Sequence, residues 1–80
     1  MKLKIRTYAS VKELLGESFE LEVNNPCTIE ELKKKIVGTN PQISELINIC
    51  RFAVNESIVN DKTPIKEDDH VHIIPPASGG

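Results

Sequence analysis

Two glycines, Gly79 and Gly80, end the sequence, and their type and spacing suit chemistry at a terminal carboxyl group. A carboxylate carried on two residues without side chains can enter a channel too narrow for any Cβ, and glycine reaches backbone angles that other residues avoid. Pro75 and Pro76 hold φ near about −65° and favour an extended exit from the preceding structure. This ending predicts a stiff base with a slim tip and a reactive carboxylate. The alternative is an ordinary frayed terminus, because chain ends are often rich in small residues.

The other residues capable of chemistry predict no independent active site. Cys27 precedes an expected helix start, where the helix dipole can stabilise a thiolate, but we favour a small semi-buried role without chemistry for it and for Cys50. His70 and His72 would share one face of a strand, and no third ligand is suitably spaced for a metal, so we expect a solvated polar face. The sequence also has no glycine-rich phosphate loop and no nucleophile–base pair. We therefore expect no cofactor bound by this chain.

Composition and charge limit the class of protein. The 80 residues are 39% hydrophobic and 28% charged, which predicts one soluble domain that folds without disulfides. The net charge of −2 argues against a nucleic-acid partner, which requires clustered Lys and Arg. No apolar run approaches the roughly 20 residues that cross a bilayer, and the N-terminal residues do not form a signal peptide. We expect a cytoplasmic protein without a membrane partner.

The first half of the chain alternates short elements that could position the tail. Residues 2–9 and 18–23 alternate apolar and polar side chains, which predicts two half-buried strands. Between them, Ser10 and Glu13 form the pattern of a capping box, and Gly16 is the expected end of a short helical turn. The apolar stripe of this turn would consist of Val11, Leu14 and Leu15.

A second capping box, Thr28 with Glu31, predicts the main helix. The helix should run to about Val37 and end at Gly38, and its lysine run 33–35 should be a solvated face. A short helix starting at Asn40-Pro41 should carry Ile43, Leu46 and Ile47. Three further strands are expected at about 51–54, 57–60 and 69–74.

The resulting order, β-β-α-β-β-β, predicts an α+β domain. Its natural candidate is a ubiquitin-like β-grasp: a mixed five-stranded sheet with one main helix packed on one face and short helical insertions. Residues 1–74 would form the globular domain and residues 75–80 an extended tail. We expect the last strand to lie centrally beside the first, and the tail to leave from a sheet edge.

Strand alternation also predicts an exposed apolar surface. If Ile5 and Ile73 point toward the helix, then Tyr8 and Ile74 point away from it, and Ile58 can join them. A contiguous exposed apolar patch usually marks a partner site. We call Tyr8, Ile58 and Ile74 the tail-root patch, because Ile74 immediately precedes the tail.

A family resemblance rests on four motifs in order along the whole chain. They are Ala9-x-Val11-x-Glu13-Leu14-x-Gly16, Ala53-Val54-Asn55, Asp69-x-Val71 and Pro75-Pro76-x-Ser78-Gly79-Gly80. These resemble the MoaD/ThiS family of ubiquitin-like sulfur carriers, in particular the small subunits of molybdopterin synthase. Where such proteins commonly read Asp-Gly-Asp-Glu-Val, this chain has Asp68 in place of the glycine. Aspartate tolerates left-handed backbone geometry, so the turn should survive. Aliphatic Ile73 and Ile74 also stand where aromatic residues are frequent.

The resemblance implies a sulfur carrier in molybdenum cofactor biosynthesis. Gly80 would be adenylated by a MoeB-like, ATP-using activating enzyme, and a sulfur donor protein would then convert it to a thiocarboxylate. Within a heterotetrameric synthase, the tail would enter a MoaE-like large subunit and give sulfur to cyclic pyranopterin monophosphate. The partner-binding residues would be the tail-root patch and the tail residues Pro75, Pro76, Ala77 and Ser78, with Gly79 next to the reacting carbonyl.

Two alternatives remain open at this point. A ThiS-like carrier for thiazole and thiamine synthesis shares the fold and the Gly-Gly ending, although it is usually shorter and lacks the Pro-Pro-x-Ser lead-in. A ubiquitin-like modifier would instead join Gly80 to a lysine of a target protein through an isopeptide bond.

Overall fold

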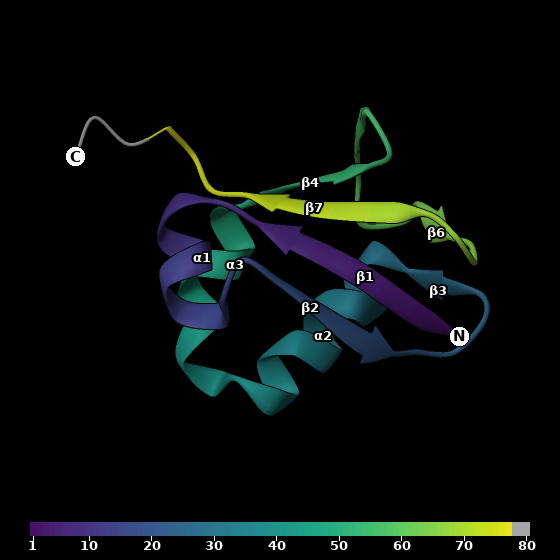
Figure 1. Cartoon of the computed structure of the whole chain (residues 1–80), viewed down its shortest axis with the longest axis horizontal. Coiled ribbons are helices and arrows are strands. Elements are labelled where there is room, and N and C mark those ends of the chain that lie inside the picture. The colour runs from purple at the N-terminus through teal and green to yellow at the C-terminus, as the bar shows by residue number, and fades with distance from the viewer. Residues whose placement is uncertain (78–80) are drawn as a thin grey trace.

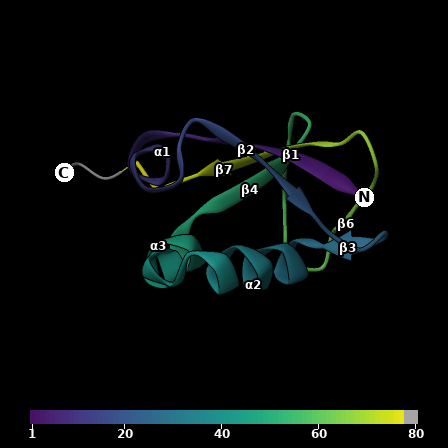
Figure 2. The ribbon, with the colours of Figure 1, turned by 60° about the horizontal axis from the view of Figure 1, so that its bottom comes forward.

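A computed structural model describes residues 1–77 and shows a mixed five-stranded sheet with helices on one face (Figures 1 and 2). The elements are β1 (Lys2–Thr7), α1 (Ala9–Leu15), β2 (Ser18–Glu22), β3 (Cys27–Thr28), α2 (Ile29–Thr39), the 3-10 helix η1 (Pro41–Ile43), α3 (Ser44–Ile49), β4 (Arg51–Val54), β5 (Ser57–Val59), β6 (Pro64–Ile65) and β7 (His70–Ile74). None of the helices in residues 1–77 is long and apolar enough to cross a membrane.

The strand order of the main sheet is β2-β1-β7-β4-β5. Strand β7 is parallel to β1 and antiparallel to β4, while β2 and β5 close the two sides by antiparallel pairing. The prediction that the last strand lies centrally beside the first is confirmed, as is the β-grasp arrangement of the elements. The chain therefore leaves the body at the C-terminal end of β7, a central strand of the sheet (Figure 1).

The core lies between the sheet and the main helix α2 (Figure 2). Alternate residues of β1 and β7, such as Ile5 and Ile73, are buried on the helix side, as their alternation predicts. Helix α2 contributes Ile29, Leu32 and Ile36, and α3 with η1 contributes Ile47 and Ile43. Burial of these side chains provides most of the stabilisation that holds the helices against the sheet.

Helix α2 begins as predicted and ends later than predicted. The Thr28 hydroxyl accepts a hydrogen bond from the Glu31 amide at 3.2 Å, and the Glu31 carboxylate accepts one from the Thr28 amide at 3.0 Å. The helix continues through Gly38 and stops at Asn40, whose φ of −138° is not helical. The predicted end at Gly38 was wrong because Pro41 sets the stop: a proline disfavours helical angles in the residue before it.

Helix α1 has no capping box at Ser10, contrary to the sequence prediction. It begins at Ala9, two residues earlier than a cap at Ser10 would require, and the extended residue Tyr8 precedes it without a side-chain cap. The Tyr8 carbonyl accepts hydrogen bonds from the amides of Val11 and Lys12, and Ala9 takes a φ of 50°. This sharp turn follows directly from the end of β1, so the helix starts before Ser10 can cap it. Leu14 is 48% exposed and does not belong to the apolar stripe.

Two turns and one short strand pairing complete the fold. Gly16 ends α1 with a φ of 88°, as predicted. Asp68 adopts a φ of 75°, so aspartate does accept the left-handed position that glycine occupies in the related motif. Strands β3 and β6 form a two-residue ladder that the sequence did not predict, because two residues show no alternation.

Candidate functional site

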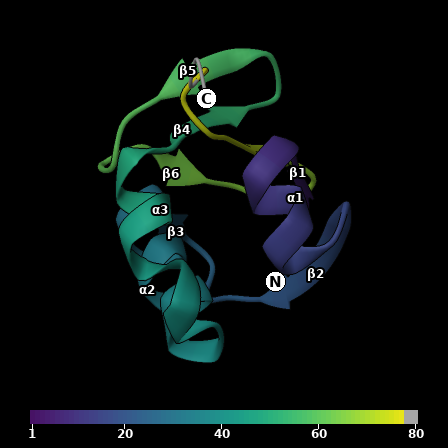
Figure 3. The same cartoon turned by 90° about the vertical axis from the view of Figure 1, so that its left-hand side faces the viewer.

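The start of the tail meets the junction of β1 and α1 at one end of the molecule, which Figure 3 views directly. Thr7 pairs with Ile73, so the next residues, Tyr8 and Ile74, come side by side on the outer face of the sheet. A notch of about 440 Å³ lies between them and α1. It is lined by Tyr8, Ala9, Ser10, Glu13, Ile74, Pro75, Pro76 and Ala77. The structure thus brings together the two central residues of the tail-root patch and the first residues of the tail.

Tyr8 is held in place by two neighbours on the outer face. Its hydroxyl lies 2.9 Å from Nδ1 of His72, and the two rings stack with centroids 5.9 Å apart. The guanidinium carbon of Arg6 lies 6.0 Å from the Tyr8 ring centroid. Tyr8 as a whole residue remains 37% exposed, so it is oriented without being covered. Such a preorganised aromatic side chain is suited to anchor a partner, since little side-chain entropy is lost on binding.

Ile58 lies on the same face but two strands away from Ile74. Ile58 pairs with Ala53, and Ala53 pairs with His72 of β7. Its side chain is 57% exposed. In the tail-root patch, Tyr8 and Ile74 are therefore adjacent. Ile58 is separated from them by its cross-strand neighbours Ala53 and His72. The role of His72 was missed from the sequence, although strand alternation already placed it on this face.

The tail residues become exposed within a few positions after β7. Ile74 and Pro75 are half-buried, whereas Pro76 and Ala77 are exposed. Ser78, Gly79 and Gly80 lie outside the described residues, so the reactive carboxylate stays a prediction from the sequence.

The cysteines and histidines do not form a second site within residues 1–77. Cys27 and Cys50 are buried, and burial is the main cause that raises the pKa of both thiols. A thiolate is therefore disfavoured at both positions. His70 is exposed on the outer face, and no three metal-ligating side chains in the described part of the chain are grouped to hold a metal ion.

Comparison with known proteins finds relatives that match nearly the full length of this chain. The molybdopterin synthase sulfur carrier subunit of Chlamydomonas reinhardtii is 32% identical over 83 residues, covering 100% of both chains. Its namesake from Dictyostelium discoideum is 32% identical over 84 residues, covering 99% of this chain and 96% of the other.

Solved structures show the same fold. SAMP1 from Haloferax volcanii superposes with a TM-score of 0.85 at 18% identity, with full coverage of both chains, a likeness of fold alone. A complex of subunits 1 and 2 of molybdopterin-converting factor from Helicobacter pylori contains a chain that matches with a TM-score of 0.71 at 26% identity, also with full coverage of both. Residues 5–80 match the ThiS family. This chain, a ubiquitin-like β-grasp protein with its tail rooted beside Tyr8, belongs to that family.

Proposed function

We propose that this chain is a sulfur carrier of molybdenum cofactor biosynthesis. The observation that carries the proposal is the full-length likeness, at 32% identity, to proteins named molybdopterin synthase sulfur carrier subunit. The geometry supports it, because residues 75–77 leave the body directly after the central strand β7, so the end of the chain starts from a firmly held base.

The chemistry takes place at the carboxyl group of Gly80. A carboxylate is a poor electrophile, so its oxygen first attacks the α-phosphorus of ATP in the activating enzyme, giving an acyl-adenylate and pyrophosphate. The outer sulfur of a persulfide on the donor protein then attacks the acyl carbon and displaces AMP. A thiol cleaves the resulting acyl disulfide and leaves the donor sulfur in a new disulfide. The product is a thiocarboxylate, a soft anion at neutral pH and a better nucleophile than the carboxylate. The carrier supplies this covalent sulfur, and its partners supply the acid–base groups.

A large-subunit partner is supported by the Helicobacter pylori neighbour, which was solved as a complex of subunits 1 and 2. In this chain the tail-root patch is the natural docking surface, because a partner that receives the tail must cover the notch from which it leaves. We infer that the MoeB-like activating enzyme uses the same surface. Since one tail occupies one active site at a time, the two complexes would be mutually exclusive.

The test is a reconstituted sulfur-transfer assay with a chain that lacks Gly80. Loss of both sulfur loading and product formation is expected, with unchanged far-ultraviolet circular dichroism because the tail lies beyond the core. Product formation by the shortened chain would refute the carrier role.

Mass spectrometry of the chain from its native host tests the alternatives. An oxygen-to-sulfur mass increase at Gly80 supports a carrier, whereas branched lysine conjugates identify a modifier. Sulfur delivered to a thiazole instead of a pterin would identify the ThiS-like alternative.

A further inference from the structure

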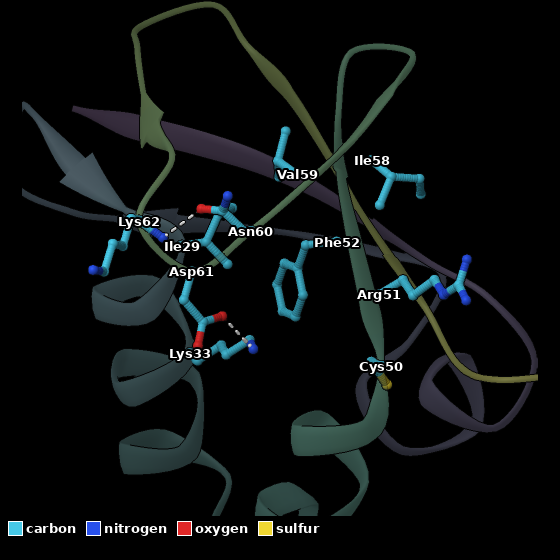
Figure 4. Close-up of a pocket in the computed structure, with 10 residues that line it drawn as sticks. All are labelled: Ile29, Lys33, Cys50, Arg51, Phe52, Ile58, Val59, Asn60, Asp61 and Lys62. Carbon is cyan, nitrogen blue, oxygen red and sulfur yellow. Dashed lines mark hydrogen bonds and ion pairs between the residues drawn. The ribbon is translucent and has the colours of Figure 1, made fainter.

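A second cleft lies away from the tail notch, between α2 and the β4–β5 side of the sheet (Figure 4). Its volume is about 570 Å³. Phe52 and Val59 provide an apolar floor, and Ile29 of α2 lies on the opposite side. Nothing in the sulfur-transfer chemistry uses this cleft.

One wall of the cleft is fixed by backbone contacts. The carbonyls of Asp61 and Thr63 accept hydrogen bonds from the first amides of α2, Glu30 at 3.0 Å and Ile29 at 3.1 Å. The Lys62 amide donates to the Asn60 side chain at 2.9 Å. The loop that carries these residues is therefore held against the helix, and the cleft is preformed.

Positive side chains outnumber negative ones around the cleft. The carboxylate of Asp61 is already paired with Lys33 at 2.6 Å, and the Lys33 ammonium lies 5.3 Å from the Phe52 ring centroid. Arg51 and Lys62 are exposed and have no ion-pair partner within residues 1–77. A chain with a net charge of −2 thus presents a locally positive rim at this site. The charge complement of this rim is an acidic ligand.

Strand β5 borders the same cleft and is an open edge of the sheet. Among residues 1–77 it pairs only with β4, and its three residues Ser57–Val59 carry no charge. The opposite edge, β2, is protected by the exposed carboxylates Glu20 and Glu22. An uncharged edge with an exposed isoleucine, Ile58, offers unpaired backbone groups to another strand.

We propose that β5 and its cleft bind an extended acidic and aliphatic segment of a protein partner, which adds to the sheet as a sixth strand. Alternate side chains of that segment would cover Ile58 on the outer face and Val59 with Phe52 in the cleft, so both must be apolar. Flanking carboxylates would meet Arg51 and Lys62. This docking requires neither the tail nor the notch at Tyr8, and it shares Ile58 with the tail-root patch.

The probe is a synthetic peptide of about eight residues, the length of a common strand, with central valines and isoleucines flanked by glutamates. Its counterpart carries lysines in place of the glutamates. Titration into the ¹⁵N-labelled full chain should shift amides at 51–52 and 57–62, and slow hydrogen exchange at 57–59. The acidic peptide should bind and the basic one should not. Shifts without slowed exchange at β5 would overturn strand addition.

Lys62→Glu should weaken peptide binding about two- to fivefold, the range of an exposed ion pair. Lys34→Glu is the matched control, since Lys34 is an exposed lysine of α2 that does not line the cleft. No shift at about 1 mM peptide would overturn the proposal, as would equal binding of both peptides. Self-association through β5 in sedimentation experiments, abolished by Val59→Asp, would assign the edge to a second copy and also overturn it.

Discussion

Replacing Tyr8 with alanine should weaken docking to the large subunit about thirtyfold, as follows from the exposure of its ring. A fully enclosed tyrosine buries roughly 200 Å². In the free chain 37% of Tyr8 is exposed, so roughly 75 Å² is left for a partner to cover. At about 25 cal/mol per Å², this surface contributes about 2 kcal/mol of binding free energy.

Titration calorimetry against the MoaE-like subunit measures this loss. Ile49→Ala is the matched control, because Ile49 is an apolar residue, 60% exposed, that belongs to α3 in the helical layer. Tyr8→Phe retains the ring but removes the hydrogen bond to His72. Comparing it with Tyr8→Ala distinguishes the contribution of buried ring area to binding from the contribution of ring orientation. Wild-type affinity of a folded Tyr8→Ala chain would refute the docking surface. A loss seen only with Ile49→Ala would place docking on the helical layer.

Further predictions concern the tail and the main helix. Gly79→Val should slow sulfur transfer more than it weakens partner binding, since the added Cβ must fit a channel shaped for backbone; an unchanged transfer rate would exclude a narrow channel. Thr28→Ala should lower the free energy of unfolding in urea by about 1 kcal/mol through loss of the cap. The Thr28 amide and hydroxyl lower the pKa of Glu31, so its stabilising contribution is present at neutral pH and lost as the pH falls through that lowered pKa. Glu31→Gln should therefore reduce the loss of unfolding free energy at acidic pH. An unchanged dependence of the unfolding free energy on pH would show that the Glu31 carboxylate does not contribute in this way.

Much of the fold was predictable because its local signals agree with its long-range pairing. Strand alternation at Ile5 and Ile73 correctly placed the core face, and the Thr28 capping box correctly placed the start of α2. The end of α2 was misjudged at Gly38, where a glycine that fits a helix interior looks the same in sequence as one that ends it. The start of α1 was misjudged at Ser10 because the preceding turn is set by the end of β1.

The site was predictable only in part, for a different reason. Tyr8 and Ile74 follow from alternation, but the hydrogen bond between Tyr8 and His72 spans 64 positions and depends on the register of β1 against β7. Lys33 belonged to a lysine run that was expected to be solvated. It instead pairs with Asp61, 28 positions away, because the loop after β5 folds back onto α2. Contacts between residues so far apart leave no pattern in the local sequence from which they could be predicted.

The central position of β7 has a mechanical consequence for a protein whose proposed partners bind and pull its tail. A pull on Pro75 acts along β7, whose ladders with β1 on one side and β4 on the other lie across the direction of force. The bonds of both ladders must then yield together, whereas an outer strand such as β5 could be peeled away one bond at a time. Under the proposed function, a partner that pulls on the tail and releases it would therefore leave the body of the chain folded.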